Sequence, residues 1–390
     1  MTKNKNVLSV LIGIVFPTVL LLLLSKMHLL LQNIFQGDGP GYWAISEYIL
    51  KNHDFNFPDS YHSYLYGLYL AAIRYLTDGL PNSVLIVQSI LFILSIYWFV
   101  KIYIDKINLF SLILISISPL SIYYAWTILT EALYIPLYFI SLVFVAKYFQ
   151  YNKKIYLYTA LFIFALIATT KNHLLIFSIL SMFILLLYSY KDKFFIVNLI
   201  KSFLIICLLI FLVKLPDLLA NKKPDTRTNS VVCSSLIAGM HEFEDFPFSV
   251  TPKNYFLEHK KEFDNKSLNF KDVIEEFLEH PLSAIRSYTF RIFRIWIPMQ
   301  HYEMKSVGIT LSILYAGTIF CLFVFGIYVA LKHEKSRFFV NLLLYPMLLL
   351  WIQQIFFHTE SRYISIIRLN EMYFAGYALY YIFYLRKKSA

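Results

Sequence analysis

Charged residues and cysteines are both scarce in this chain. Asp, Glu, Lys and Arg make up 15% of the 390 residues, whereas soluble domains carry about 25%. Hydrophobic residues make up 58%, and several apolar runs approach or exceed the roughly 20 residues that cross a bilayer as a helix. These proportions exclude an ordinary soluble globular protein and predict an all-α, polytopic membrane protein.

The chain has only three cysteines, which limits what can hold its polar regions together. Cys207 and Cys321 lie within apolar runs, and Cys233 is alone in the longest polar stretch. No disulfide can form within that stretch, so we expect packing or the membrane surface to hold it. The sequence also lacks a Walker loop, a dinucleotide fingerprint, a Cys-rich metal site and a nucleophile elbow, which removes the enzyme classes that depend on these motifs.

Apolar runs predict about ten membrane-spanning helices. The fifth is short, and the seventh contains Asn198 and Lys201. The first follows a short basic start and has no small-residue cleavage site, so we interpret it as a retained anchor. The predicted spans are Val7–Ser25, Ser83–Tyr103, Leu109–Ala125, Ala132–Phe149, Tyr156–Thr170, Leu174–Tyr190, Phe195–Val213, Val307–Leu331, Phe338–Phe357 and Tyr363–Leu385.

Lysine and arginine in the short connections orient these spans. They gather in every alternate connection, such as Lys153 and Lys154 after the fourth span, and such loops face the cytoplasm. Both termini are predicted on that side. The net charge of +11 is explained by this asymmetry, and because no basic stripe follows a soluble domain, nucleic acid is not an expected partner. Residues 32–82 and 215–306 form two long outer loops, and we find no internal repeat or low-complexity linker.

Both outer loops predict amphipathic helices. In the first, Gly37–Gly41 predicts a turn, and an apolar helical face follows it: Tyr42, Ile45, Tyr48 and Ile49. A second aromatic helix is predicted over about Tyr61–Leu76. In the large loop, Pro281 separates an apolar stripe that begins at Phe270 from a second helix, whose other face carries Arg286, Arg291 and Arg294. These arginines either face lipid headgroups or steer an anionic substrate.

Polar and charged residues cluster at the predicted outer ends of the spans. They are Asp38, Thr130-Glu131, Lys171-Asn172-His173 and His358-Thr359-Glu360-Ser361-Arg362. Asp38 has the chemistry of a general base or of a ligand to a divalent metal; the alternative is a turn aspartate that satisfies local backbone N–H groups. Glu131 is a candidate cavity residue, or an acid that complements a helix dipole.

The later residues suggest a phosphate site. Lys171 and His173 can bind phosphate as a point charge and a donor, or form a solvated polar turn. The planar fork of Arg362 matches phosphate oxygens, although an ion pair with Glu360 is the alternative. His358 is a possible metal ligand.

Two further groups are predicted to be structural or solvated. Arg368 and Glu371, at i,i+3 spacing, are predicted to form a structural ion pair. His241-Glu242-Phe243-Glu244-Asp245 is expected to be a solvated acidic loop rather than a metal site.

In layout, nearly the whole chain resembles the GT-C superfamily of membrane glycosyltransferases, closest to the bacterial branch of protein O-mannosyltransferases and the lipid A aminoarabinose transferase. The resemblance rests on one span followed by a long outer loop that opens with an aspartate, and on later segments in the same order: Gly37–Tyr42, Ser118-Pro119, Thr130–Leu133, Ala168–Lys171 and His358–Tyr363. It implies one GT-C-like domain over residues 1–390, in a bacterial inner membrane, with the large outer loop as a lid.

The resemblance also implies a reaction and roles for the clustered residues. Such enzymes move a sugar from a polyprenyl-phosphate carrier to an acceptor on the non-cytoplasmic face, here a lipid, glycan or protein. Asp38 would be the catalytic carboxylate, and Lys171 and Arg362 would hold the donor phosphate. Glu131, His173, His358 and Glu360 would line the cavity. The first loop lacks the adjacent acidic pair of the mannosyltransferase branch, which leaves a Mg²⁺ or Mn²⁺ cofactor open, with Asp38, Glu131 and His358 as candidate ligands.

Two other functions remain open from the sequence. An O-antigen polymerase or ligase also uses outer-face arginines on lipid-linked glycans. A lipid-linked glycan flippase or transporter would place charged residues near the middle of the membrane and repeat its two halves.

Overall fold

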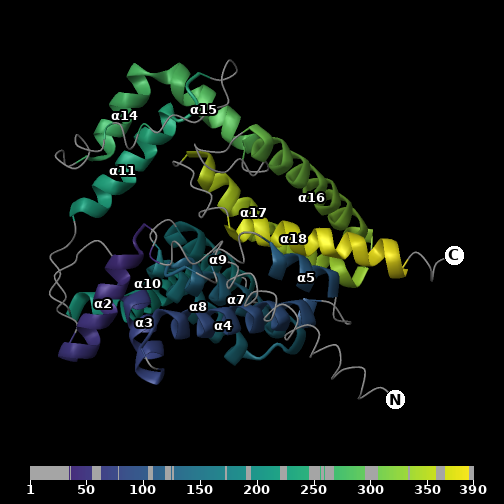
Figure 1. Ribbon diagram of the computed structural model, residues 1–390, viewed down its shortest axis with the longest axis horizontal. Helices are drawn as coiled ribbons and strands as arrows, with labels where there is room; N and C mark the ends of the chain where they lie inside the picture. Colours follow the sequence, from purple (N-terminus) through teal and green to yellow (C-terminus); the bar gives the residue numbers. More distant parts are fainter. Residues whose placement is uncertain are drawn as a thin grey trace. The chain divides into compact units, whose positions relative to one another are not determined.

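The computed structural model describes residues 35, 37–54, 63–77, 79–103, 109–118, 124, 127–171, 174–189, 195–219, 226–245, 255, 259, 268–294, 306–332, 334–356 and 365–385. Within these residues the regular secondary structure is helical throughout, without strands, which confirms the all-α class (Figure 1). The predicted first span, Val7–Ser25, lies outside them. By contacts the chain divides into two compact units. The first is Met1–Lys222 with Phe323–Leu343 and Met372–Ala390, and the second is Lys223–Leu322 with Leu344–Glu371.

The first unit is built mainly from the N-terminal helices. They are α2 (Gly39–Asn52), α3 (Tyr64–Leu76), α4 (Pro81–Tyr103), α5 (Leu109–Ile117), α7 (Glu131–Tyr151), α8 (Lys154–Thr170), α9 (Leu175–Ser189) and α10 (Phe195–Leu219). The second unit contains α11 (Thr226–His241), α14 (Phe270–Glu279) and α15 (Pro281–Arg294). Three later helices contribute to both units: α16 (Ser306–Lys332), α17 (Glu334–Phe356) and α18 (Ser365–Tyr380), which a π-helical turn, η4 (Tyr381–Leu385), extends.

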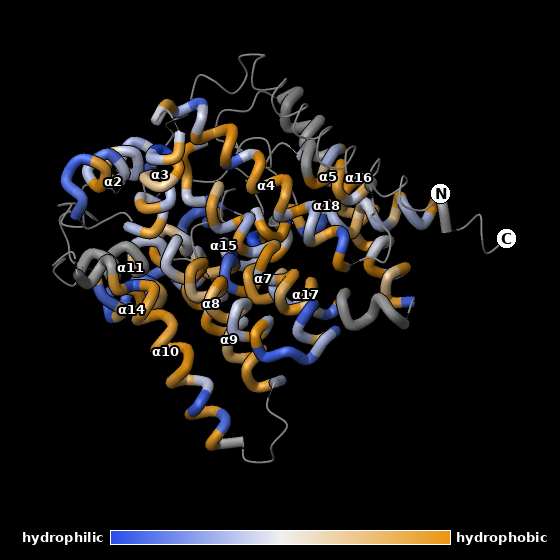
Figure 2. Tube along the Cα trace, turned by 90° about the horizontal axis from the view of Figure 1, so that it is seen from below, coloured by the Kyte–Doolittle hydropathy of each residue, from blue (hydrophilic) through white to orange (hydrophobic). Residues whose placement is uncertain are grey.

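Four of the described helices are long and apolar enough to cross a membrane. Their apolar cores are Pro81–Ile102, Glu131–Tyr151, Val197–Leu215 and Leu314–Lys332, in α4, α7, α10 and α16. Lys154–Thr170, Leu175–Ser189 and Leu343–Phe356 are apolar but shorter. Hydrophobic residues dominate these helices (Figure 2). A membrane protein is therefore supported, while the full count of about ten spans stays a prediction.

The seventh predicted span forms one continuous helix in spite of its polar residues. Asn198 of α10 is 4% exposed, so its amide is buried in protein rather than facing lipid, where a polar group is costly. Only 17% of the apolar window of α10 is buried. Few residues of this window are therefore covered by the described part of the protein.

Helix α7 is the centre of the first unit. Most of its residues are buried, Tyr134, Tyr138 and Phe139 among them, as expected for a helix that is apolar all round. Only Asn152 and Lys153 separate α7 from α8, and Asn152 ends α7 in the left-handed conformation. So short a connection makes neighbouring helices antiparallel. The first residue of α7 and the last residue of α8 therefore lie at the same end of the pair.

Helices α2 and α3 pack tightly on each other. A Cβ on Gly67 would lie 2.4 Å from Cγ2 of Ile45, which is closer than carbon atoms approach. Arg74 lies over the ring of Trp43, 3.9 Å from its centroid, and donates to Ser46 Oγ at 2.7 Å. Tyr42 and Ile45 are buried in the protein. These two residues therefore do not face the membrane surface, contrary to the interfacial orientation predicted for their helix.

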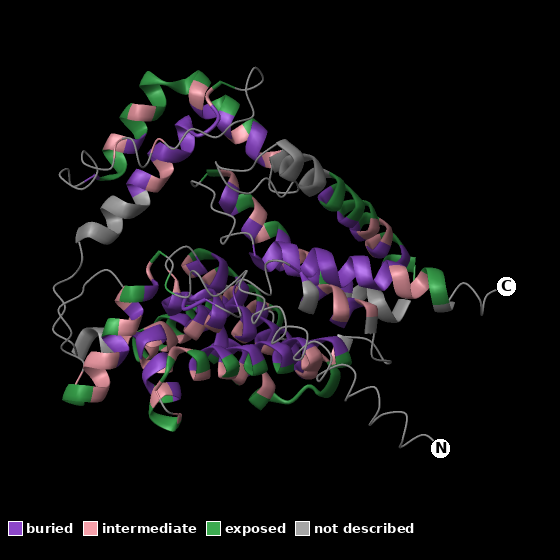
Figure 3. Cartoon of the chain, in the orientation of Figure 1, coloured by how far each residue is buried: buried purple, intermediate pink, exposed green. Residues whose placement is uncertain are grey.

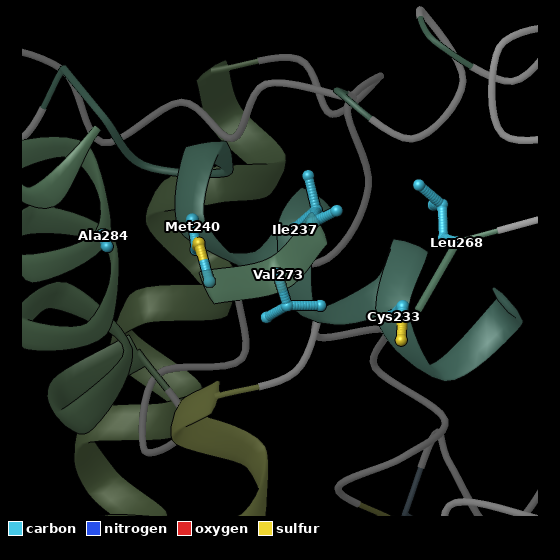
Figure 4. Close-up of a cluster of buried hydrophobic side chains, with 6 residues drawn as sticks. All are labelled: Cys233, Ile237, Met240, Leu268, Val273 and Ala284. Atoms are coloured by element: carbon cyan, nitrogen blue, oxygen red, sulfur yellow. The ribbon is translucent and has the colours of Figure 1, made fainter. Parts of the chain in front are cut away.

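The described helices of the predicted large outer loop, α11, α14 and α15, pack around a small core of their own. Cys233, Ile237, Met240, Leu268, Val273 and Ala284 are buried together (Figure 4). A capping box between Asn269 and Asp272 begins α14. Helix α14 ends before Pro281, as the sequence predicted, and Pro281 begins α15. These helices are thus held together by packing, and Cys233 is a free thiol.

The apolar stripe predicted on α14 lies largely on the exposed side. Phe270, Ile274 and Leu278 are 65%, 57% and 69% exposed, while Val273 is buried. Figure 3 shows the same pattern along α14. The small core therefore uses only one residue of the stripe, and the rest remains available to a membrane interface.

Candidate functional site

Asp38 stands at the start of α2 but does not cap it. Gly37 has a φ of 51°, which favours glycine. The Asp38 side chain makes no capping hydrogen bond to α2, so the interpretation as a turn aspartate satisfying local N–H groups does not hold for that helix. Its carboxylate is instead directed at a residue far along the chain.

That residue is Lys171, which directly follows α8. Its Nζ lies 3.4 Å from Oδ2 of Asp38, and the two side chains are 13% and 23% exposed. The residues are 133 positions apart in the sequence. A lysine this enclosed is not the solvated turn lysine that was the alternative prediction. The pair places an acid and a cation side by side with partial access to solvent.

Close backbone packing fixes Asp38 in this position. A Cβ on Gly39 would lie 2.7 Å from the carbonyl oxygen of Ile128, so the start of α2 lies directly against the segment that precedes α7. Ser63 Oγ, just before α3, donates to the carbonyl oxygen of Thr169 at 2.6 Å. The starts of α2 and α3 are thereby held against the start of α7 and the end of α8.

Glu131, the first residue of α7, is fully buried at the same end. Its side chain is 0% exposed, and Oε2 accepts a 3.2 Å hydrogen bond from Thr130 Oγ1. Oε1 is also buried and has no hydrogen-bond partner within the described part of the chain. A carboxylate is costly to bury when its lone pairs are unsatisfied. A helix-dipole role in the first turn remains compatible with this position, but it leaves Oε1 unexplained.

Tyr66 of α3 lies close enough to Glu131 to be affected by its charge. Its hydroxyl accepts a 2.9 Å hydrogen bond from Gln88 Nε2, and its ring meets Tyr42 of α2 edge-on at 5.0 Å. Burial raises the pKa of Tyr66 well above its usual value, and the nearby charge of Glu131 contributes in the same direction. Tyr66 is therefore a buried, neutral hydroxyl that contacts side chains of α2 and α4.

Several of the predicted site residues lie outside the described residues: His173, His358, Glu360 and Arg362. For Arg368 and Glu371 the predicted ion pair is present, at 2.8 Å, with the side chains 6% and 1% exposed.

A metal site does not assemble from the described residues. Among them no group of three or more His, Cys, Asp or Glu side chains is placed to hold a metal ion. The group that contacts Asp38 is an ammonium, which does not fit a divalent cation. A metal requirement therefore stays a prediction, and we derive no chemical step through a metal.

The segment from His241 to Asp245 is the clearest failure of the sequence prediction. It is not a solvated acidic loop, because His241 is 4% exposed and Glu242 is 0% exposed. His241 contacts Glu244 at 3.0 Å and Glu276 of α14 at 2.8 Å. A buried polar network therefore closes the end of α11.

Arg291 was also misplaced by the sequence analysis. It is 0% exposed and paired with Glu242, so it faces neither lipid headgroups nor a substrate. Ala284 and Ser287 are also 0% exposed, and their spacing from Arg291 puts all three on one helical face. Two small residues on that face were the available signal that this side of α15 packs closely against protein.

Comparison with known proteins adds no relative. Neither the models of known protein families nor the curated proteins contain a match to the sequence.

Proposed function

We propose that the protein is a GT-C-like glycosyltransferase. It moves a sugar from a polyprenyl-phosphate donor to a lipid, glycan or protein acceptor on the non-cytoplasmic face of a bacterial inner membrane. The observation that carries the proposal is the contact between Asp38 and Lys171, at 3.4 Å and partly buried. In this contact, a carboxylate that can accept a proton lies beside a cation that can bind the leaving phosphate.

The proposed reaction is a direct displacement with inversion. An acceptor hydroxyl attacks the anomeric carbon, the new C–O bond forms, and the bond to the carrier phosphate breaks. Asp38 takes the proton of the hydroxyl, and the polyprenyl phosphate leaves with the bonding electrons. The sugar–phosphate bond supplies the driving force, so the outer face needs no nucleotide, consistent with the missing nucleotide motifs.

Lys171 has two partners during this cycle. Before the donor binds, its ammonium lies beside Asp38. As the bond to phosphate breaks, charge develops on the leaving oxygen, and a cation already in place stabilises that charge without reorganising solvent. The long lysine side chain allows Nζ to move from the carboxylate to the phosphate. Arg362 is proposed as the second phosphate ligand on its chemistry alone.

The decisive experiment uses the purified protein in detergent with a panel of polyprenyl-phosphate-linked sugars. Release of free polyprenyl phosphate, with a glycosylated product in cell-envelope extract, supports a transferase. Movement of a whole oligosaccharide would indicate a polymerase or ligase instead. A donor that remains intact under every acceptor condition would contradict the proposal.

A lipid-linked glycan flippase is the second candidate. The buried Arg368–Glu371 pair in α18 favours it, because ionisable residues inside predicted spans mark transport pathways as well as structural pairs. Transbilayer movement of a fluorescent lipid-linked sugar in proteoliposomes, without its hydrolysis or transfer, would select the flippase.

A further inference from the structure

The end of α3 carries the most exposed large hydrophobic side chains among the described residues. Tyr75 and Leu76 are 78% and 81% exposed, and Leu80, which precedes α4, is 57% exposed. We call these three residues the α3 tip, and Figure 3 shows the exposed end of α3. Apolar side chains that cluster on a surface mark a contact with something other than water.

A short, well-defined turn connects the tip to α4. Thr77 Oγ1 donates to the carbonyl oxygen of Ile73 at 2.9 Å and accepts from the backbone N–H of Gly79 at 3.4 Å. Gly79 has a φ of 73°, a conformation that glycine adopts at little cost. The backbone N–H of Val84 then donates to the carbonyl oxygen of Leu80 at 3.3 Å. These hydrogen bonds hold the tip beside the first turn of α4.

Helix α4 is one of the helices that are long and apolar enough to cross a membrane, over Pro81–Ile102. Its exposed apolar residues include a row at four-residue spacing: Ile86, Ile90 and Leu94. On a membrane-spanning helix, such a row faces lipid. Leu80 is the neighbour of Pro81, and the Cα of Leu76 lies within about 18 Å of the Cα of Pro81. The tip therefore lies where α4 enters the bilayer.

We propose that the α3 tip is inserted into the bilayer, at the interface between lipid headgroups and acyl chains. Tyrosine suits this depth, because its ring is apolar and its hydroxyl reaches the headgroups. The two leucines supply the apolar surface that favours insertion. Tyr42 and Ile45 of α2 are buried in the protein, so α3 makes the membrane contact that the sequence predicted for α2. This inference requires only that α4 crosses a membrane.

The tip also determines the position of α2, which begins directly after Asp38. Arg74, the residue before the tip, lies over the ring of Trp43. Its Nη1 donates to the carbonyl oxygen of Trp43 at 3.3 Å and to Ser46 Oγ at 2.7 Å. Asp38 precedes Trp43 by five residues, or about 7.5 Å along a helix axis. An inserted tip therefore holds Asp38 at a set height relative to the headgroups. If the proposed function is correct, the phosphate of a membrane-bound donor lies at that height.

Depth-dependent fluorescence quenching of the full-length protein tests the insertion. Leu76→Cys, Lys51→Cys and Ile90→Cys are made in a cysteine-free background, labelled with a small environment-sensitive fluorophore and reconstituted into lipid nanodiscs. The quenchers are lipids spin-labelled near the headgroup end of the acyl chain and iodide in the water. Lys51, with a side chain that is 72% exposed on α2, is the aqueous control. Ile90, exposed near the middle of the α4 span, is the acyl-chain control.

We expect the spin-labelled lipid to quench the label at Leu76→Cys severalfold more than the label at Lys51→Cys, and iodide to give the reverse order. Equal quenching by iodide at these two positions would put the tip in water and overturn the proposal. Protection of Leu76→Cys from both quenchers would overturn it as well, because protein would then cover the tip, either another segment of this chain or a second copy.

Leu76→Asp tests what the anchor does for the proposed reaction. The charge should withdraw the tip from the bilayer, so that a label at Tyr75→Cys loses its quenching by lipid. Asn52→Asp is the matched control, because Asn52 is an exposed residue of α2 that donates to the carbonyl oxygen of Tyr48 in its own helix at 3.1 Å. In Leu76→Asp, the KM for a long-chain polyprenyl donor should rise about tenfold. A water-soluble short-chain donor should show no such rise, since the membrane does not set its height.

The outcomes separate this inference from the proposed function. Lipid quenching that persists at Tyr75→Cys in Leu76→Asp would contradict an anchor made by the apolar tip. Lost quenching with an unchanged KM for the long-chain donor would overturn the link between the tip and Asp38. A wild-type protein that transfers no sugar defeats the proposed function, while quenching at Leu76→Cys still decides whether the tip lies in the bilayer.

Discussion

At the residue scale, three side chains at one end of the α7–α8 pair have environments that ordinary packing does not explain. Asp38 begins a helix without capping it, and Lys171 is largely enclosed against that carboxylate. Glu131 is buried with one oxygen that finds no hydrogen-bond partner among the described residues. Such positions are costly and tend to be kept where they have a use. Each one can be changed singly.

Asp38→Asn is expected to abolish transfer. The amide keeps the shape of the side chain but cannot accept the proton of the acceptor, so kcat should fall on the order of a hundredfold or more. Glu47→Gln is the matched control, since Glu47 lies on the same helix and forms an exposed ion pair with Lys51 at 2.7 Å. The measurement is the initial rate of transfer at saturating donor. Equal losses of rate in both variants would show that Asp38 is not the catalytic base.

Lys171→Met is expected to lower kcat about a hundredfold through lost stabilisation of the leaving phosphate. Lys51→Met is the control, because the side chain of Lys51 is 72% exposed. Donors that differ in the acidity of the leaving phosphate provide the measurement: the loss should shrink as the leaving group improves. A loss that is the same for every leaving group would assign Lys171 to holding Asp38 alone.

Cys233 provides a pH-dependent test of the outer loop. Burial, and then the charge of Asp272, raises the pKa of its thiol. A raised pKa means that folding favours the protonated thiol, so its contribution to stability is complete below the ordinary thiol pKa of about 8.5 and is lost as the pH rises above it. The melting temperature should therefore fall more between pH 8 and pH 10 in wild type than in Cys233→Ala. Parallel curves for the two proteins would refute this.

At the scale of elements, the periodicity of apolar residues predicted where the helices lie. Which face of each helix is buried depends on close contacts with neighbouring elements. Pro281 marked the boundary between α14 and α15. The turn predicted over Gly37–Gly41 was too long, because α2 already begins at Gly39. The buried face of α15 was mistaken because it carries alanine, serine and arginine, while the apolar Leu282 and Ile285 are exposed. Near a membrane, apolar residues have two favourable environments, so an apolar stripe alone does not identify the packed face.

Gly39→Ala tests the contact that holds α2. The added methyl would meet the carbonyl oxygen of Ile128 at 2.7 Å, so the start of α2 must shift and take Asp38 with it. We expect a loss of about 1–3 kcal/mol in stability and a larger fractional loss of transfer. Gly317→Ala on α16 is the control, because nothing lies within 4 Å of its added Cβ. Thermal melting and initial rates of both variants are the measurements, and equal behaviour would contradict the steric argument.

At the scale of the whole molecule, composition predicted the class, an all-α membrane protein. It could not predict contacts between residues that are far apart in the sequence. Apolar runs predicted the positions of α4, α7, α10 and α16, which are long enough to span a membrane. Loop charge put Asp38 and Lys171 on one side, but only folding could show that they touch across 133 positions. The burial of Glu242 was not predictable, because its charge indicates a surface position until its partner is known. For Arg291 the available signal was indirect, the small residues Ala284 and Ser287 on the same helical face.

The orientation of the chain in the membrane has a direct test. In a cysteine-free background, Lys51→Cys on α2 should react with an impermeant maleimide added to intact spheroplasts, because Lys51 is exposed and predicted outside. Lys153→Cys, between α7 and α8, is also exposed but predicted inside, so it should react only after permeabilisation. The reverse pattern would put Asp38 in the cytoplasm and end the proposed reaction.

The thinly covered helix α10 has a consequence for work in artificial bilayers. Its apolar part, Val197–Leu215, has 19 residues and is about 28 Å long, close to the roughly 30 Å of a hydrocarbon layer. With 17% of that window buried, few protein contacts oppose a change in its inclination. Lipids with short acyl chains will therefore tilt this helix first, and the choice of lipid will govern how well the reconstituted protein keeps its native arrangement.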